Sequence, residues 1–278
     1  MKIAYGTYAM PMVPLEEALL ALAEISYDGV EIAISPRHNT APDQLDPERR
    51  RRLRELLKRL KLEVPALFVL GKVMVEDERE HWGNLQLIRR VAQLARDLDI
   101  GPKPVISMGV GGRSAEWMER REELARLLED YAELASEEGF IFAVEPHVNA
   151  IVDRSERAIW LMKKLNNPLV RLHFDIVHFY LAGESIEEAV FKLVPYTAHT
   201  HVTDVRRYEE GFEFVPLGQG ELNLVRYVRA MDEAGWKGFI TIEVSAMVWS
   251  KEGYDPFETA SNSYRVLKEA FEKAGVAR

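Results

Sequence analysis

The chain has 278 residues, of which 47% are hydrophobic and 29% are charged, close to the averages of globular domains and enough for a large core. Its 36 lysines and arginines are outnumbered by 45 aspartates and glutamates, and the net charge of −9 makes nucleic acid a poor partner. It has no cysteine, which excludes disulfides and thiolate metal sites, no apolar run of ~18 residues and no signal-like start. We therefore expect a cytoplasmic protein that does not enter a membrane.

Short runs rich in β-branched residues alternate with longer helical patterns along the chain, without a linker rich in glycine or serine between its halves. This alternation is typical of parallel strands joined by helices. Strands are predicted at residues 3–8, 29–34, 62–69, 104–108, 140–145, 170–175, 197–202 and 239–244. Helices are predicted around residues 15–25, 47–61, 81–98, 114–138, 154–165, 185–193, 222–234 and 256–274.

Eight such strand–helix units predict a single (β/α)8 TIM barrel, with residues 1–278 forming one domain. Each unit averages about 35 residues, which suits this fold. The alternative α/β architecture, a doubly wound sheet, would need a glycine-rich turn after the first strand. The sequence Tyr5-Gly-Thr-Tyr8 has no such pattern, so the barrel is favoured.

Four ionisable residues stand at the C-terminal ends of four successive predicted strands: Glu145, Asp175, His201 and Glu243. Active-site residues of barrels collect at this end, and neighbouring strands lie only ~4.8 Å apart, so the four side chains can converge on one ion. Three carboxylates and one imidazole suit Mn²⁺ best, and the site would also accept Mg²⁺, Co²⁺ or Zn²⁺. Without an ion, we expect at least one of these carboxylates to hold a proton.

Other histidines share the inner face of the strands, because side chains alternate with a period of two. His173 and His199 lie one layer deeper, where they would support the metal ligands or the packing rather than bind the ion. His147 and His178 lie at or beyond the strand ends and are candidates for contact with a substrate.

The loops at the same end of the barrel offer weaker candidates. Arg207, which follows the seventh strand, could grip a hydroxyl, carboxylate or phosphate, or it could be an ordinary surface arginine. For Gly218-Gln-Gly220 a simple turn into the next helix is favoured over a phosphate cradle. A further set of aromatic residues could line the pocket or belong to the core: Tyr8, Phe68, Trp117 and Trp249.

Six segments of the chain carry a family resemblance: Tyr27–Ile32, Val144–His147, Phe174–His178, His199–Asp204, Leu217–Leu222 and Ile242–Val244. In them the chain resembles the xylose isomerase-like barrel superfamily, particularly its sugar phosphate isomerase and epimerase branch. The resemblance implies that Glu145, Asp175, His201 and Glu243 hold the metal and that His178 contacts the substrate. It also implies proton transfer by Glu145 and Glu243 next to a carbonyl, through an enediolate.

Departures from this family pattern bear on the substrate. Ketose 3-epimerases similar to this chain have a second glutamate six residues after the one on the fifth strand, where this chain has Ile151. The stretch Glu145–Asn149 with Asp153 looks more like inosose isomerases or dehydratases and 3-dehydroshikimate dehydratases. We expect an isomerase or epimerase of a small sugar or cyclitol, with dehydration of a keto-cyclitol or a 3-dehydroshikimate-like acid as the alternative.

Two other functions are disfavoured. Endonuclease IV shares the barrel but uses three metals and extra histidines on the earlier strands, and here the third and fourth strands end without histidine. A non-catalytic sugar-binding barrel is disfavoured because all four metal-ligand positions are retained. The implied partner is a small-molecule sugar or cyclitol. Since family members often form dimers or tetramers, a homo-oligomer fits the resemblance, although no apolar stripe on the predicted helices identifies an interface.

Overall fold

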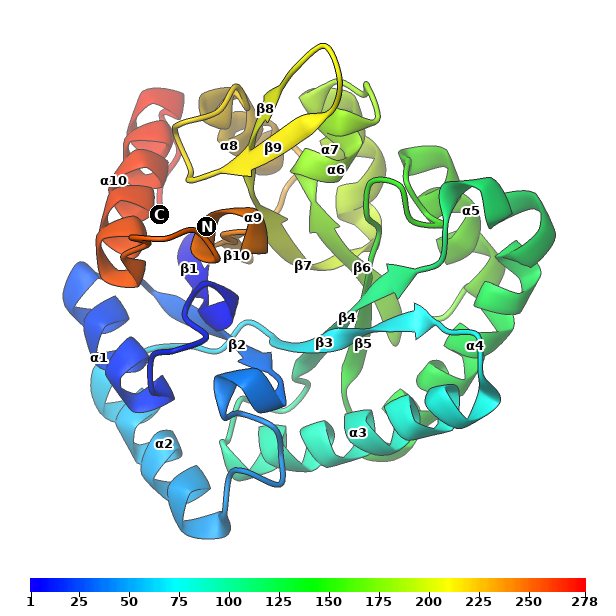
Figure 1. The fold of residues 1–278 in the computed structure, drawn as a ribbon, viewed down its shortest axis with the longest axis horizontal. Coiled ribbons are helices and arrows are strands. Elements are labelled where there is room, and N and C mark those ends of the chain that lie inside the picture. Colours follow the sequence, from blue (N-terminus) through cyan, green and yellow to red (C-terminus); the bar gives the residue numbers. More distant parts are fainter.

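The computed structural model describes residues 1–278 and contains a closed barrel of eight parallel strands surrounded by helices (Figure 1). The strands follow one another around the barrel in the order β1-β10-β7-β6-β5-β4-β3-β2, which confirms the predicted (β/α)8 architecture. The barrel strands are β1 (Lys2–Gly6), β2 (Gly29–Ile34), β3 (Leu67–Met74), β4 (Val105–Gly111), β5 (Ile141–Glu145), β6 (Val170–Asp175), β7 (Thr197–Val202) and β10 (Phe239–Ile242).

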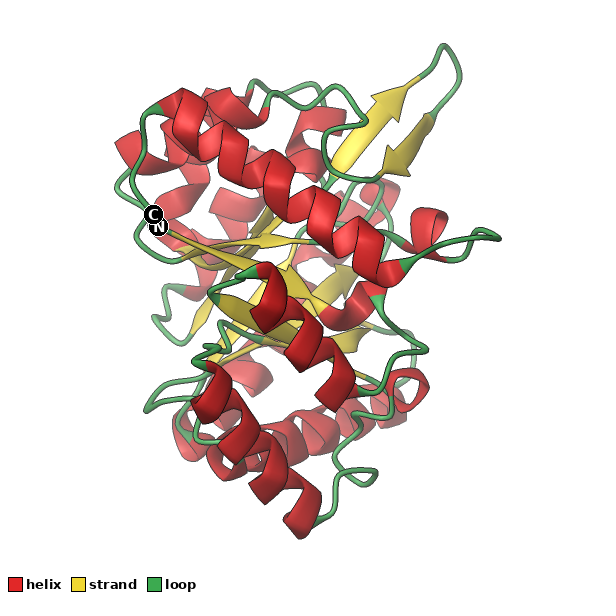
Figure 2. Ribbon diagram, turned by 90° about the vertical axis from the view of Figure 1, so that its left-hand side faces the viewer, coloured by secondary structure: helices red, strands yellow, loops and turns green.

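Eight main helices cover the outside of the barrel, as Figure 2 shows from the side. They are α1 (Leu15–Ile25), α2 (Pro47–Leu60), α3 (Glu78–Asp97), α4 (Trp117–Glu138), α5 (Ser155–Leu165), α7 (Ile186–Leu193), α8 (Leu224–Glu233) and α10 (Pro256–Ala274). Four short 3-10 helices are η1 (Thr7–Ala9), η2 (Pro36–His38), η3 (Ser114–Glu116) and η4 (Val194–Tyr196). No helix of the chain combines the length and the apolar character needed to cross a membrane.

The arginine-rich helix α2 illustrates how local sequence produces these elements. Asp46 caps its first turn by accepting a hydrogen bond from the Arg49 amide, and Pro47 occupies the first helical position, where no amide proton is needed. The helix buries Leu53, Leu56 and Leu57 against the barrel, while Arg51, Arg52 and Arg59 face solvent. Amphipathic spacing therefore fixes both the helix and its orientation.

The third strand differs most from its predicted bounds. Residues 62–66 form only an isolated bridge between Glu63 and Gly29, and β3 begins at Leu67 and runs to Met74. Pro65 has no amide proton to donate to a sheet, which accounts for the late start. The predicted eighth strand, in turn, ends early: β10 stops at Ile242, so Glu243 lies just beyond it.

Three elements were missed because they lie in regions predicted as loops. Two are the short helices α6 (Ile176–Leu181) and α9 (Ala246–Trp249), which follow β6 and β10. The third is an antiparallel hairpin of β8 (Asp204–Arg207) and β9 (Phe212–Val215), which projects from the molecule in Figure 2. Val205 and Phe214 of the hairpin pack with Val177 of α6 in a small separate apolar cluster, so tertiary packing holds this segment in place.

Candidate metal centre

The four predicted ligands converge at the C-terminal end of the barrel. Glu145 ends β5, Asp175 ends β6, His201 lies near the end of β7 and Glu243 follows β10, and these strands are neighbours. The register pairs Asp175 with His201, and the amide of Glu243 donates to the Val202 carbonyl of β7. One ligand atom from each residue lies within 4.8 Å of the corresponding atom of every other. The parallel register thus brings residues from four separate units to one point.

The spacing of these atoms suits a single divalent ion. His201 Nδ1 is 3.5 Å from Glu145 Oε1 and 3.6 Å from Glu243 Oε2. Two atoms that bind one ion at its usual bond length of about 2.1 Å are themselves roughly 3.0–3.5 Å apart. His201 Nδ1 is also buried without a hydrogen-bond partner. A buried nitrogen that faces carboxylates and lacks a partner is what an ion would satisfy.

Thr203 orders the carboxylates of this cluster and was not identified from the sequence. Its hydroxyl is 2.8 Å from Asp175 Oδ2 and 3.1 Å from Glu243 Oε2, so it donates to one or the other. The amide of Val177 donates to the remaining Asp175 oxygen, Oδ1, at 3.0 Å. The available signal was its position two residues after His201, within the segment His199–Asp204.

Burial and mutual repulsion shift the acidity of two of these carboxyl groups. Desolvation, with repulsion from Glu243, raises the pKa of Glu145 to about 7. Desolvation and the same neighbour raise the pKa of Asp175 to about 7. These directions agree with the expectation that carboxylates so close together retain a proton in the absence of a cation.

A second cluster lies one layer deeper and is centred on Glu31 of β2. His199 Nε2–H donates to Glu31 Oε2 at 2.6 Å, and His201 Nε2–H lies 2.8 and 2.9 Å from its two carboxylate oxygens. His173 packs edge-on against His201, with ring centroids 4.0 Å apart. Distances of 2.6–2.9 Å are those of charge-assisted hydrogen bonds and are too short for two atoms that share an ion. Glu31, His199 and His201 therefore form a hydrogen-bond network, and His173 packs against it without a hydrogen bond of its own.

Glu31 was also missed by the sequence analysis, although it is the one charged residue in the predicted strand at 29–34. Complete burial alone would raise its pKa, but the charge of His201 and the hydrogen bonds from both imidazoles hold the pKa of Glu31 at about 2. Gly6 of β1 makes room for it, since a Cβ at Gly6 would lie 2.9 Å from Glu31 Oε1. As acceptor from His201 Nε2–H, Glu31 leaves Nδ1 of that ring directed at the metal cluster.

The two predicted substrate histidines lie together. The rings of His147 and His178 are 3.9 Å apart between centroids, and His178 also contacts Phe214 of the hairpin at 6.0 Å. His178 is buried, and its burial lowers the pKa of the imidazole well below the usual value. His147 is exposed, with Nδ1 2.7 Å from the Val148 carbonyl oxygen. The pair therefore joins one buried ring to one that solvent can reach.

Arg207 does not join the cluster of predicted site residues. It is exposed on β8, forms an ion pair with Glu221 and donates to the Tyr180 hydroxyl at 2.8 Å. Its guanidinium carbon also stacks 4.5 Å from the centre of the Tyr180 ring. These contacts hold the side chain between the hairpin and α6.

The Gly218–Gly220 segment forms the simple turn that the sequence favoured. Its backbone amides are hydrogen-bonded within the chain. The carboxylate of the buried residue Asp204 accepts from the amides of Gly218, Gly220 and Leu222 at 2.9, 2.9 and 3.1 Å. A Cβ at Gly220 would lie only 2.2 Å from Asp204 Oδ1. A carboxylate of the chain itself thus fills the position that an anion would take.

Three of the four aromatic candidates form a chain of contacts that starts at the metal cluster. The Phe68 ring lies 5.5 Å from that of His201, Tyr8 lies 6.3 Å from Phe68, and Trp249 lies 5.4 Å from Tyr8. Trp117 packs elsewhere, against Trp160 at 5.1 Å. The first three rings form what we call the aromatic wall of the mouth.

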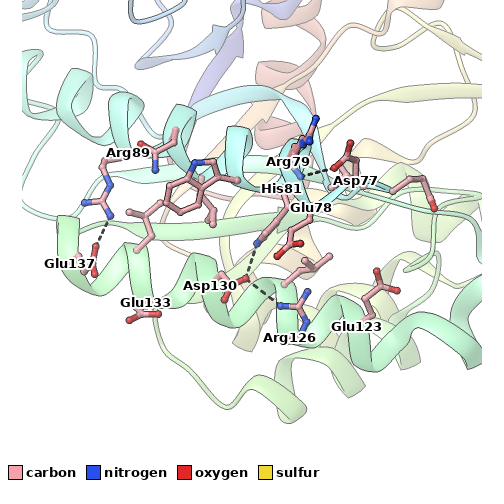
Figure 3. Close-up of a pocket in the computed structure, with 17 residues that line it drawn as sticks. Asp77, Glu78, Arg79, His81, Arg89, Glu123, Arg126, Asp130, Glu133 and Glu137 are labelled. Carbon is pink, nitrogen blue, oxygen red and sulfur yellow. Dashed lines mark hydrogen bonds and ion pairs between the residues drawn. The ribbon is translucent and has the colours of Figure 1, made fainter.

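A cavity of about 990 Å³ lies outside the barrel between α3 and α4 (Figure 3). It contains none of the predicted site residues. Several of its polar groups are paired with one another: Asp130 binds His81 at 2.7 Å and lies 3.7 Å from Arg126, and Arg89 binds Glu137 at 2.7 Å. The groove is a paired helix–helix surface, and the barrel mouth is the better candidate for chemistry.

Comparisons with known proteins agree with this fold. A family model described as xylose isomerase-like TIM barrel matches residues 19–270. Fructoselysine 3-epimerase of Escherichia coli O157:H7 is 22% identical over 89% of this chain and 91% of its own length. L-ribulose-5-phosphate 3-epimerase UlaE of Escherichia coli (strain SMS-3-5 / SECEC) is 23% identical over 94% and 91%. The crystal structure of the IolI protein with a bound zinc atom superposes with a TM-score of 0.79, at 20% identity over 99% of this chain and 98% of that chain.

Proposed function

The chain belongs to the xylose isomerase-like TIM barrel family, and from that premise we propose that it is a divalent-metal-dependent isomerase or epimerase of a small sugar or cyclitol. The observation that carries the proposal is the convergence of Glu145, Asp175, His201 and Glu243 within 4.8 Å, with His201 Nδ1 buried and free. That two relatives are sugar 3-epimerases supports the reaction class.

These four residues would hold the ion, and Mn²⁺ is the best match for three carboxylates and one imidazole. When bound, the ion supplies positive charge that polarises a carbonyl and an adjacent hydroxyl of the substrate. The network beneath contributes orientation, because Glu31 fixes the proton of His201 on Nε2.

Glu145 and Glu243 are the groups we assign to proton transfer. They come from β5 and from the end of β10, the two outer members of the four-strand run, so the substrate would lie between them. Glu145 is almost fully buried, and desolvation with repulsion from Glu243 raises the pKa of its carboxyl group to about 7, so it is basic enough to take a proton from carbon. The Glu243 carboxyl would then return a proton to the opposite face. His178 and His147 are assigned to hydroxyl groups of the substrate.

The test is proton exchange in D₂O, followed by NMR, on a set of ketoses, inososes and 3-dehydroshikimate with added Mn²⁺. We expect deuterium to enter at the carbon next to a carbonyl in at least one substrate, without loss of water, and EDTA to stop the exchange. A product that lacks one water would establish the dehydratase alternative. Absence of turnover on the whole set, or exchange that EDTA leaves unchanged, would overturn the proposal.

A further inference from the structure

The basic side chains in the strand-to-helix loops of the barrel mouth are almost all engaged. The strand-to-helix loops carry six lysines and arginines: Arg37, Arg113, Arg154, Arg206, Arg207 and Lys251. Four of them form ion pairs with Glu116, Asp153, Glu221 and Glu213, and Arg206 donates to the Gln219 carbonyl. Arg37, in η2 after β2, is exposed and has no hydrogen bond or ion pair. It is the one free cation in these loops.

Arg37 is connected to the metal cluster through the aromatic wall. Its guanidinium carbon lies 4.5 Å from the centre of the Trp249 ring. From there the wall continues through Tyr8 and Phe68 to His201, with successive centroid distances of 5.4, 6.3 and 5.5 Å. The aromatic wall therefore runs from the metal cluster outward to Arg37.

The backbone that carries Arg37 is held firmly. Ser35 Oγ–H donates to His38 Nδ1 at 2.7 Å, while His38 Nε2–H donates to the carbonyl oxygen of Tyr8 at 3.2 Å. The Thr40 hydroxyl donates to the Ala33 carbonyl on β2 at 2.5 Å. These buried bonds tie the second loop to the first and to its own strand, so the position of Arg37 is fixed before any ligand arrives.

A cavity of about 330 Å³ lies beside this arginine, between the loops that follow β1 and β2. Its lining includes Arg37 and Asn39, whose side-chain amide has no hydrogen-bond partner. Pro11 and Met12 close another side. A guanidinium and an amide donor in a small recess are the groups that bind a carboxylate or a phosphate.

The charges of the mouth indicate which kind of ligand this recess would bind. The three carboxylates of the cluster and a net charge of −9 repel an anionic substrate, and one divalent ion offsets only part of that repulsion. We propose that Arg37, with Asn39, binds the anionic end of the substrate, a carboxylate or a phosphate, at the outer end of the aromatic wall. The inference rests on the proposed function in that it assumes a carbonyl substrate at the metal cluster. It narrows the substrate class to acidic sugars or keto-acids.

Binding, measured separately from turnover, tests this assignment. Isothermal titration with Mn²⁺-loaded protein would compare L-ribulose with L-ribulose 5-phosphate, and an inosose with 3-dehydroshikimate. The wild type should bind at least one anionic member more tightly than its neutral counterpart. Arg37→Met should weaken that member about 10- to 100-fold and leave the neutral one within about twofold, and Arg37→Lys should restore part of the loss. The ribulose pair tests for recognition of a phosphate, and the pair of an inosose with 3-dehydroshikimate tests for recognition of a carboxylate.

Arg113→Met is the matched control, because it removes the same charge from another loop of the mouth, where the side chain is 81% exposed. It should leave the preference unchanged. Equal losses for anionic and neutral probes in Arg37→Met, no loss at all, or the same selective loss in Arg113→Met would each overturn the assignment. Because the titration measures binding without catalysis, its result can be interpreted even if the proton-exchange test fails. The proton-exchange test can likewise be interpreted if the binding test fails.

Discussion

Two layers of ionisable side chains lie one above the other in the barrel and share His201, yet their geometry differs. In the upper layer, His201 Nδ1 lies 3.5 and 3.6 Å from the carboxylates of Glu145 and Glu243. In the lower layer, Nε2 of the same ring lies 2.8 and 2.9 Å from Glu31. Similar residue types, a carboxylate and an imidazole, thus meet at two spacings on the two sides of one ring.

The difference of less than 1 Å separates two kinds of chemistry. At the shorter spacing a proton lies between nitrogen and oxygen, and the pair is satisfied without help. At the longer spacing a hydrogen bond is weak, and a cation is the group that can satisfy the nitrogen and the carboxylates together. His201 therefore connects the layers: the Glu31 bond below fixes the ring, and the ring presents Nδ1 above.

The largest expected effect comes from the upper layer. Glu145→Gln and Glu243→Gln each remove a metal ligand and a group assigned to proton transfer, so the rate of C–H exchange in D₂O should fall by at least about 10³-fold. Circular dichroism should show that both variants stay folded. The half-buried carboxylate of Glu213, on the hairpin, supplies the control, and Glu213→Gln should keep wild-type exchange. Near-normal exchange in either site variant would contradict the assigned roles.

A smaller effect is expected from the lower layer. Glu31→Gln keeps the shape of the side chain but removes the charge that orients His201 and His199, so Mn²⁺ affinity should fall about 10- to 100-fold. Calorimetric titration of the metal-free protein with Mn²⁺ measures this without reference to catalysis. Gly6→Ala should act in the same direction, because its Cβ would lie 2.9 Å from Glu31 Oε1.

Ser107→Ala provides the matched control for the Glu31 variant. Ser107 is also fully buried, on β4, and its hydroxyl has no hydrogen-bond partner within the protein. Its loss should leave Mn²⁺ affinity unchanged. If Glu31→Gln and Ser107→Ala weaken binding equally, the lower layer contributes only general packing and the contrast between the layers is lost.

The sequence predicted the upper layer more completely than the lower one. The upper ligands stand at strand ends on four adjacent strands, so the topology of the barrel was enough to bring them together. Glu31 lies on β2, three strands away from β7 around the barrel, and it reaches His201 only because Gly6 on the intervening β1 has no side chain. That condition depends on the strand register of the closed barrel, which the hydrophobic periodicity of the sequence does not specify.

The loops show a similar division. The period-two and helical patterns located the barrel strands, but the hairpin Asp204–Val215 depends on packing against α6, which was itself unrecognised. The direction of Arg207 follows from the same contact, since Tyr180 of α6 and Glu221 both bind it. Interactions between separate loops decide such positions, and no local pattern in the sequence encodes them.

The smallest expected effect concerns the pH dependence of the metal-free protein. The pKa of Asp175 is raised from 3.8 to about 7, so ionisation destabilises the folded state progressively as pH rises from about 4 to 7. Asp175→Asn keeps a side chain that accepts from Thr203 and removes this penalty. In EDTA, its melting temperature should exceed that of the wild type by a few degrees at pH 8 and match it near pH 4.

Asp153 should affect the pH dependence of stability in the opposite direction to Asp175. Burial opposes its ionisation, but hydrogen bonds from Arg154 and Ser114 lower the pKa of Asp153, so its charge stabilises the fold above the pKa of an unfolded aspartate. Asp153→Asn should therefore lower the melting temperature at pH 8 and lose that effect as pH falls below about 4. If Asp175→Asn also lowers it at pH 8, the upper carboxylates do not repel one another in the metal-free protein. The upper layer would then be, like the lower one, a set of satisfied hydrogen bonds.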